Sequence, residues 1–383
     1  MHSTDSKGPA LSNFTPDWAI APGEVLAEEL KARGMSQTDL AHRTSLSIKH
    51  VNQIIKRNAP LSADVALSFE RALGIPAKLW LQTEAAWQAH TTAIAARSSS
   101  STFHSWLTRF PLAALATRGV IGLRDDTATQ VEDLLRFFRV TDPAAFDKVC
   151  LQPQVNYKRS QTNKLDPYAT ATWVRLAERA AQDLAEDAPL YAPKALRAAA
   201  RDIPAFTKMP LVEGFRAARD RLRQAGVLLV FVEPLDKTGL FGISKSLDDG
   251  RHMIGLTGRM KTLDSFWFAL AHEIAHILLH PKRATFIDTS TSVANDDEDE
   301  QESEANKFAS ALYLSPALRE ELFAAGPAAI ARIAAQASVD RAIIAGQYAH
   351  QTGDYALMNK YRPRLDADQL RSLEALSFAS RSS

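Results

Sequence analysis

The chain has 383 residues, of which 46% are hydrophobic and 23% are charged, and its formal net charge at pH 7 is +1. This composition excludes global disorder and is that of a globular protein long enough for two or three domains. The near-zero charge also excludes a strongly basic or acidic chain, so any contact with nucleic acid must come from a local surface.

The N-terminal part is predicted to be a flexible tail followed by a bundle of short helices. Residues 1–16 are polar, with proline and serine, and are expected to form a loose tail. Residues 17–95 are assigned to the bundle, in which helix-period segments are separated by clear breaks. The expected helices are Val25 to Ala32, Gln37 to Arg43, Ile48 to Lys56 and Ser62 to Leu73, the last ending at Gly74.

The second and third of these helices have the pattern of a DNA-reading hairpin. Ser36 and Ser47 are natural N-caps. Four apolar residues have the spacing to bury against one another, namely Leu40, Ala41, Val51 and Ile54. The candidate DNA-contacting residues on the polar side are Gln37, Ser47, Lys49, His50, Asn52 and Gln53.

These residue types suit the chemistry of DNA recognition. Asparagine and glutamine read adenine edges in the major groove, and lysine contacts guanine or phosphate. Gln37 stands at a helix N-terminus, where it would suit a phosphate. The same pattern is also that of a helical hairpin with a solvated polar face, or of a protein-binding helix pair.

A domain boundary is predicted in the stretch from His90 to Ser101. Periodic hydrophobicity is lost after Ala96, and four consecutive serines follow, which suits a hinge or linker. Residues 96–204 are expected to form an all-helical connector, because helical patterns such as Gln130 to Phe138 alternate with proline-containing turns.

The pattern changes at Gly226. The run Val-Leu-Leu-Val-Phe-Val that follows predicts a buried strand, and His252 to Thr257 predicts another, with the glycine-punctuated segment from Gly239 to Ser246 between them. Strands are then expected to stop, because Leu263 to His280 and Glu302 to Leu314 have helical patterns. We therefore expect an α+β domain with a small sheet over residues 205–320, and a helical region over residues 321–383.

The expected helix from Leu263 contains a His-Glu-x-x-His motif. His272 and His276 share one face of the helix and Glu273 lies beside it, which is the geometry that zinc hydrolases use. Glu302 on the next helix is the strongest third ligand, and Asn306, one turn later, could hydrogen-bond a ligand histidine. Zinc would lower the pKa of its bound water, Glu273 would take the proton, and the hydroxide would attack a peptide carbonyl.

Neighbouring groups are weaker candidates. Glu304 points to nearly the opposite helix face from Glu302, and His280 precedes Pro281, where a histidine more often caps the helix. The acidic run at 296–300 lacks the glycine-containing loop of an EF-hand and is expected to be a solvated loop before a helix N-terminus. The two motif histidines could also be merely polar residues of an amphipathic helix.

The N-terminal bundle resembles a known family. The segment from Pro22 to Trp80, with Ser36-Gln-Thr-Asp-Leu-Ala and Val51-Asn-Gln-Ile-Ile, closely resembles the Xre/Cro-type helix-turn-helix antitoxins of the HigA kind. The resemblance implies a bacterial regulator, typically dimeric, that represses by binding double-stranded operator DNA.

The second motif also resembles a family. Phe266 to His280, with the later Glu302-Ser-Glu-Ala-Asn306 segment, resembles the ImmA/IrrE metallopeptidases, which implies a zincin-like domain. By that resemblance His272, His276 and Glu302 bind Zn²⁺ and Glu273 is the general base. Members of the family are associated with cleaving helix-turn-helix repressors.

Together these features predict a DNA-binding transcriptional regulator fused to a zinc-dependent, metallopeptidase-like domain. It would cleave a repressor, or its own chain near Ser98 to Ser101, to switch gene expression. The alternative is a HigA-type antitoxin and repressor whose zinc domain is a non-proteolytic sensor or a toxin-binding scaffold. Glu273 favours the enzyme, because a structural zinc site needs no general base. The expected protein partners are a substrate or a toxin and a second copy of the chain, as a homodimer.

The expected compartment is the bacterial cytoplasm. Cys150 is the single cysteine, which excludes an internal disulfide and fits a reducing compartment. The first residues lack the apolar core of a signal peptide, and no window of about 18 uninterrupted apolar residues follows. We expect no membrane contact.

Overall fold

The computed structural model describes residues 18–123, 125–151, 166–259, 261–280, 285–289 and 296–378, so the predicted tail lies outside the described residues. The chain divides into two compact units. The first comprises the residues up to His104 together with Asp126–Glu132, and the second comprises Ser105–Asp125 and the residues from Asp133 onward.

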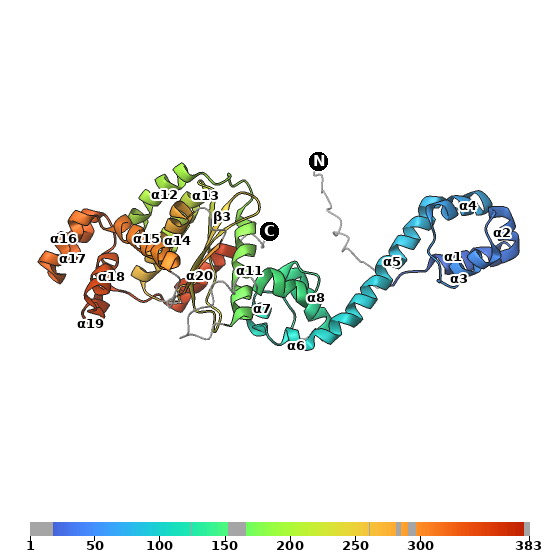
Figure 1. Ribbon diagram of the computed structural model, residues 1–383, viewed down its shortest axis with the longest axis horizontal. Helices are drawn as coiled ribbons and strands as arrows, with labels where there is room; N and C mark the ends of the chain where they lie inside the picture. The colour runs from blue at the N-terminus through green and yellow to red at the C-terminus, as the bar shows by residue number, and fades with distance from the viewer. Residues whose placement is uncertain are drawn as a thin grey trace, which may run out of the picture. The chain divides into compact units, whose positions relative to one another are not determined.

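The first unit is a bundle of short helices (Figure 1). They are α1 (Pro22–Ala32), α2 (Gln37–Thr44), α3 (Ile48–Ile55), α4 (Ala63–Leu73), α5 (Ala77–Ser100) and the 3-10 turn η1 (Ser101–Phe103). Ser36 caps α2 in a reciprocal capping box with Asp39, and the Ser47 hydroxyl accepts from the His50 backbone N–H at the start of α3. The helices close over one apolar core that includes Leu26, Leu40, Val51, Phe69 and Trp80. The helix-turn-helix arrangement is therefore formed, and its two predicted caps are confirmed.

The prediction of a hinge or linker between His90 and Ser101 is wrong, because the chain is helical there. Helix α5 runs without a break through His90 to Ser100. Residues 92–95 and Arg97 on this helix are exposed, so a helix can continue here without the apolar periodicity of a buried face. Alanine is the best helix former and serine costs little in a helix, so the serines do not interrupt it.

The second unit begins with helices, as expected for the connector. They are α6 (His104–Leu107), α7 (Leu112–Thr117), α8 (Thr127–Phe138), α9 (Pro143–Phe146), the π-helical turn η2 (Asp147–Leu151), α11 (Pro167–Leu184), α12 (Pro193–Phe206) and α13 (Leu211–Arg223). The first residue of α6 and the first half of α8, up to Glu132, are counted with the first unit. Phe110 makes edge-to-face contacts with Trp106, Phe146 and Tyr168, so packed aromatic rings hold the first of these helices together.

The sheet has four strands in the order β1-β3-β2-β4. They are β1 (Val227–Phe231), β2 (Leu240–Ser246), β3 (His252–Leu256) and β4 (Thr285–Thr289). β1 pairs with β3 in parallel, whereas β2 is antiparallel to both β3 and β4. The small mixed sheet confirms the predicted fold class. The expectation that strands stop before residue 263 was wrong, because β4 forms beyond the next helix.

A short edge strand such as β4 is hard to recognise in a sequence. It has five residues between polar stretches, and it exists because its backbone pairs with β2, for example Ile287 with Ile243. Such a strand lies at the edge of the sheet, paired with a neighbour on one side only, and edge strands are often short and flanked by polar residues.

Helices cover both faces of the sheet (Figure 1). A Cβ added to Gly255 of β3 would meet Trp173 and Ala177 of α11, whereas a Cβ added to Gly242 of β2 would meet Glu273 of α14 (Leu263–Leu279). α11 and α14 therefore pack on opposite faces, as the alternation of side chains along a strand requires.

The remaining helices follow α14. They are α15 (Asp296–Tyr313), α16 (Pro316–Ala325), η3 (Pro327–Ala329), α17 (Ile330–Ala337), α18 (Arg341–Thr352), α19 (Tyr355–Met358), η4 (Asn359–Tyr361) and α20 (Ala367–Phe378). The predicted acidic loop at 296–300 is instead the start of α15, where carboxylates are favourable against the partial positive charge of a helix N-terminus. α20 returns to the sheet, where the Ser377 hydroxyl accepts from the Phe231 backbone N–H at 2.8 Å.

No helix within the described parts of the chain is long and apolar enough to cross a membrane.

Candidate metal centre and nucleic-acid interface

Helix α14 carries the His-Glu-x-x-His motif in its buried middle. His272 is 3% exposed, Glu273 is fully buried and His276 is 1% exposed. Apolar residues occupy most of the other positions of this helix, so it packs on the sheet and against α15 at the same time. Buried polar side chains within such a helix need partners, and α15 supplies them for His272 and His276.

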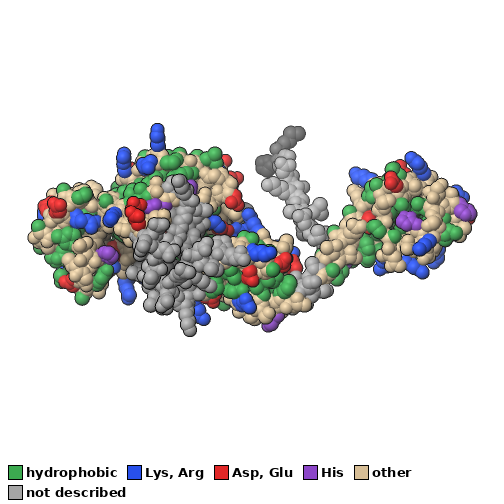
Figure 2. Space-filling model, in the orientation of Figure 1, with side chains coloured by type: hydrophobic (Ala, Val, Ile, Leu, Met, Phe, Trp, Pro, Cys, Tyr) green, Lys and Arg blue, Asp and Glu red, His purple; other side chains and the backbone are tan. Residues whose placement is uncertain are grey.

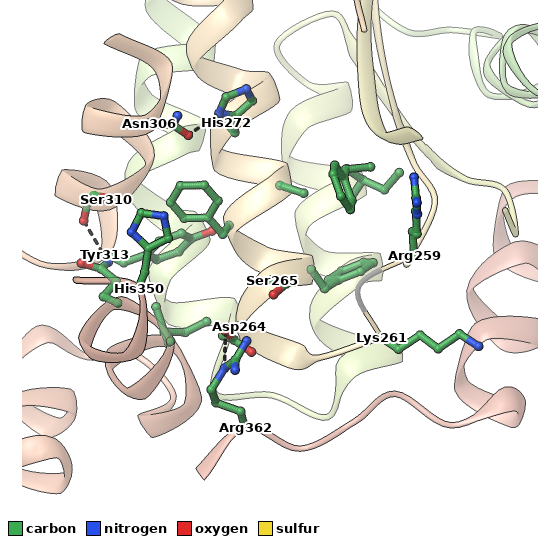
Figure 3. A pocket seen from close by; sticks show the side chains of 18 of the residues that line it. Arg259, Lys261, Asp264, Ser265, His272, Asn306, Ser310, Tyr313, His350 and Arg362 are labelled. Carbon is green, nitrogen blue, oxygen red and sulfur yellow. Dashed lines mark hydrogen bonds and ion pairs between the residues drawn. The ribbon is translucent and has the colours of Figure 1, made fainter. Parts of the chain in front are cut away.

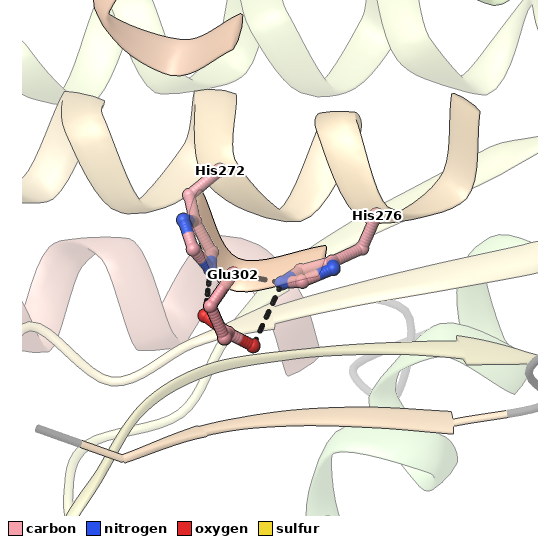
Figure 4. A group of neighbouring side chains, drawn as sticks. All are labelled: His272, His276 and Glu302. Atoms are coloured by element: carbon pink, nitrogen blue, oxygen red, sulfur yellow. Dashed lines mark hydrogen bonds and ion pairs between the residues drawn. The ribbon is translucent and has the colours of Figure 1, made fainter. Parts of the chain in front are cut away.

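Three side chains from the two helices converge (Figure 4). His272 Nε2 lies 2.9 Å from His276 Nε2. The two carboxylate oxygens of Glu302 lie 3.1 Å from His272 Nε2 and 3.4 Å from His276 Nε2. Zinc bonds of about 2.0–2.1 Å in a tetrahedral site set neighbouring ligand atoms about 3.3 Å apart. The spacing and the donor types of this triangle therefore fit three corners of a zinc site.

Asn306 completes one side of the cluster. Its Oδ1 lies 3.0 Å from His272 Nδ1, one turn of α15 beyond Glu302 (Figure 3). With the amide oxygen as acceptor, His272 donates from Nδ1, which would leave the lone pair of Nε2 for an ion. This is the arrangement in which an outer hydrogen bond fixes a ligand histidine.

The electrostatics of the cluster favour the metal-binding protonation states. Burial raises the pKa of Glu302, but the interactions with His272 and His276 outweigh it and hold the pKa below its ordinary value of 4.5. Burial lowers the pKa of His276, and the nearby Glu302 only partly opposes this effect. At neutral pH Glu302 is a carboxylate and His276 is a neutral imidazole, as metal ligation requires.

Glu273 lies against the backbone of β2. A Cβ at Gly242 would come within 2.6 Å of Glu273 Oε1, so the strand approaches this carboxylate as closely as only a glycine allows. Gly242 was not among the predicted site residues. A glycine inside a strand often marks a close backbone approach, and this was the signal in the sequence that could have identified it.

A cavity of about 560 Å³ adjoins the cluster. His272, Glu302 and Asn306 line one part of it, and residues as far along the chain as His350 and Arg362 line the rest (Figure 3). This cavity could not be predicted from the sequence, because its walls come from segments that are separated by about a hundred positions. It is large enough for a few side chains of a peptide or for a small ligand.

The weaker candidates lie outside the three-residue cluster. His280 forms the C-cap of α14, as predicted, and its Nε2 lies 3.2 Å from the Gln301 carbonyl oxygen. The Glu304 carboxylate lies 3.8 Å from the same histidine nitrogen. Among the described residues, the side chains that could hold one ion together are His272, His276 and Glu302.

The helix-turn-helix residues show a pairing that the sequence did not reveal. The Asn52 amide donates to Gln37 Oε1 at 3.0 Å, so α3 and α2 are joined by two of the predicted DNA-contacting side chains. Lys49 is exposed, and His50 and Gln53 are half-buried on the same helix. Side-chain amides held in this way are oriented before any ligand arrives.

The surface around these two helices is locally basic, although the whole chain is not. Residues 36–58 contain Arg43, Lys49, Lys56 and Arg57, all exposed, and Asp39 is the acidic residue of this segment. Figure 2 shows Lys and Arg side chains scattered over the visible face of the first unit. Such a surface meets the electrostatic requirement for a phosphate backbone.

Comparisons with known proteins match two parts of the chain. A family model described as a helix-turn-helix matches residues 26–80, and a peptidase family model described as an IrrE N-terminal-like domain matches residues 226–344. Virulence-associated protein I of Dichelobacter nodosus is 39% identical over 80 residues, which are 21% of this chain and 72% of that protein. A solved structure of an addiction module antidote protein of a HigA family from Coxiella burnetii is 29% identical and covers 22% of this chain and 91% of its own, with a TM-score of 0.20.

Proposed function

We propose that this chain, whose N-terminal domain belongs to the helix-turn-helix family and which also carries an IrrE N-terminal-like peptidase domain, is a DNA-binding transcriptional regulator and a zinc-dependent endopeptidase. In this proposal it acts in the bacterial cytoplasm, as a homodimer on double-stranded operator DNA. Proteolysis by the second domain changes which genes the first domain, or a related repressor, keeps silent.

The proposed metal ligands are His272, His276 and Glu302. These three side chains would hold the ion, and a set of three protein ligands is typical of catalytic zinc sites, whereas closed structural sites have four. Zinc, when bound, supplies the Lewis acidity that makes water a better nucleophile at neutral pH and polarises the peptide carbonyl.

The burial of Glu273 beside the cluster is the observation that carries the catalytic part of the proposal. Glu273 accepts a proton from the attacking water as the new C–O bond forms at the peptide carbonyl carbon. It then delivers that proton to the leaving nitrogen as the C–N bond breaks. A purely structural site would give no reason to bury a carboxylate at this place.

The structure favours a substrate in trans over self-cleavage near Ser98 to Ser101. Residues up to Ser100 belong to α5, and η1 follows directly. The peptide carbonyls of a helix are hydrogen-bonded within it and surrounded by side chains, so a nucleophile cannot reach them unless the helix unfolds. We therefore propose a separate helix-turn-helix repressor as the substrate.

The experiment compares the full-length protein with Glu273→Gln. Zinc content is measured by inductively coupled plasma mass spectrometry, and cleavage of the chain itself and of a co-encoded helix-turn-helix repressor is followed on gels. We expect both proteins to hold one zinc ion per chain and the variant to cleave at least about 100-fold more slowly. Zinc binding without Glu273-dependent proteolysis would refute the peptidase and leave a non-proteolytic sensor or a toxin-binding scaffold.

The DNA-binding part is tested by comparing Gln53→Ala with Lys49→Ala on a specific operator and on random DNA. Gln53→Ala should weaken operator binding by about 10-fold or more and leave random DNA almost unaffected, because base contacts specify the sequence. Lys49→Ala should weaken both and reduce the salt dependence by about one counterion. Equal losses on both DNAs for Gln53→Ala would contradict its assignment as a base-reading residue.

A further inference from the structure

Two arginines in the cavity beside the metal cluster have side-chain acceptors, although Asp264 Oδ1 is buried without a partner among the described residues. The Arg362 guanidinium donates to Asp264 Oδ2 at 2.7 Å, and both side chains are only 9% exposed. Arg319 donates to Gln347 Oε1 at 2.8 Å. These arginines have protein acceptors, so their presence in the cavity wall is explained by the fold itself.

Arg259 differs from them. Its guanidinium lies over the Phe241 ring, 5.3 Å from the ring centroid, and its backbone N–H donates to Thr257 Oγ1 at 3.1 Å. Its Nη1 is buried and has no hydrogen-bond acceptor among the described residues. A buried ionised donor without an acceptor is unfavourable, and here it lies in the wall of a cavity that can hold a ligand.

The surroundings of Arg259 restrict the ligand. Phe241, Leu256 and Phe268 line the same cavity, and so do the charged side chains of Lys261 and Asp264. The ligand would therefore meet both apolar and charged groups. The guanidinium fork pairs best with a planar group that presents two oxygens. Among the described residues, Arg259 Nη1 is the one buried arginine nitrogen of the cavity wall that has no acceptor, so a single planar carboxylate would satisfy it.

Arg259 and the proposed general base Glu273 both pack against neighbouring residues of β2. Phe241, which supports the guanidinium, directly precedes Gly242, which contacts the Glu273 carboxylate. Figure 3 shows Arg259 and His350 on opposite sides of the cavity that His272 also lines. A group held by Arg259 would thus lie in the same space as the metal cluster.

We propose that Arg259 binds a carboxylate in this cavity. The carboxylate is either the acidic side chain of a peptide or a free dicarboxylate. The peptide source rests on the proposed function, whereas the binding of a carboxylate by Arg259 does not. With a peptide, Arg259 would select substrates that carry aspartate or glutamate near the bond that is cut.

The test measures binding and requires no proteolysis. The full-length Glu273→Gln protein is titrated by calorimetry with a short capped alanine peptide that carries a central glutamate, and with its central-glutamine counterpart. Glutarate and inorganic phosphate are titrated separately. We expect the glutamate peptide to bind about tenfold or more tightly than the glutamine peptide, because a charge-assisted fork is lost in the latter.

Two substitutions at Arg259 and one matched control complete the experiment. Arg259→Gln should abolish the preference for glutamate, and Arg259→Lys should restore only part of it because lysine keeps the charge without the fork. The control is Arg371→Gln, which removes an exposed arginine that pairs with Asp368 and does not line the cavity. Urea unfolding of each variant reports folding, and Arg259→Gln should unfold at nearly the same urea concentration as the parent.

Each outcome either supports or overturns the binding of a carboxylate by Arg259. Preference for the glutamate peptide that depends on Arg259 supports the proposal with a peptide source, and glutarate binding alone that depends on Arg259 supports it with a free ligand. Binding of neither carboxylate, binding of phosphate only, or binding that Arg259→Gln leaves unchanged would overturn it. A large loss of stability in Arg259→Gln would show that Arg259 serves the fold. Absence of zinc or of proteolysis affects only the proposed function.

Discussion

Substitution of Gly242 by alanine should separate metal binding from catalysis. The added Cβ would stand 2.6 Å from Glu273 Oε1, 3.1 Å from its Cγ and 3.2 Å from its Cδ. Ordinary contact begins near 3.4 Å, so the carboxylate must move by about 0.8 Å. The three nearest atoms all belong to Glu273 and none belongs to His272, His276 or Glu302, so the metal ligands should keep their positions.

The expected loss of cleavage rate follows from the strong dependence of proton transfer on the position of the carboxylate. A misplacement of about 1 Å at a reacting centre can cost about 100-fold in rate. Alanine also overpacks the site by about 1–3 kcal/mol, partly offset by about 0.4–1 kcal/mol because alanine has less freedom than glycine in the unfolded chain. We therefore expect a loss of unfolding free energy of about 0–2.5 kcal/mol together with a rate loss of about 30- to 100-fold.

The assay uses the purified full-length protein with three readouts: zinc content, urea unfolding and the rate of repressor cleavage. Gly255→Ala is the matched control. Its Cβ would come within 3.0 Å of Ile243 and Trp173, on the opposite face of the sheet from Glu273. It should lose comparable stability and keep its cleavage rate.

Two results would contradict the reasoning. If Gly242→Ala retains zinc and cleaves at the normal rate, the position of Glu273 against β2 does not govern the reaction. If Gly255→Ala loses activity as strongly as Gly242→Ala, general loosening of the sheet explains both variants.

Two further predictions concern groups around the site and in the fold. Asn306→Ala should weaken zinc affinity by about 10- to 100-fold, because His272 loses the acceptor that orients its ring. A competition titration with a chelator measures this affinity, and an unchanged value would show that Asn306 does not position His272. The second concerns pH: burial raises the pKa of Glu178, but Lys245 and Arg175 outweigh it and hold the pKa below 4.5, so this carboxylate stabilises the fold above that pH. That contribution is lost as the pH falls through the lowered pKa of Glu178. The difference in unfolding free energy between the protein and Glu178→Gln should therefore shrink below pH 4.5. A difference that grows in acid would show that the pKa of Glu178 is raised in the folded protein and would contradict the prediction.

The elements that the sequence predicted well are those set by neighbours along the chain. Ser36 and Ser47 cap their helices because a serine hydroxyl reaches the backbone N–H three residues later, which requires nothing beyond the local turn. The buried strands β1 and β3 were recognisable from continuous apolar runs. The prediction of a linker between His90 and Ser101 failed because apolar periodicity reports burial, whereas the backbone of α5 continues as a helix to Ser100.

The sequence by itself determined that His272 and His276 share a helix face, because the period of the α-helix places residues four apart side by side. It also indicated Glu302 and Asn306 as partners, but only the folded chain brings their helix within 3.1 Å of His272. The tertiary structure alone decided the pairing of β4, the approach of Gly242 to the Glu273 carboxylate and the place of Arg259 in the cavity. Relations within one helix follow from bond geometry and periodicity, whereas contacts between distant segments depend on how the whole core packs.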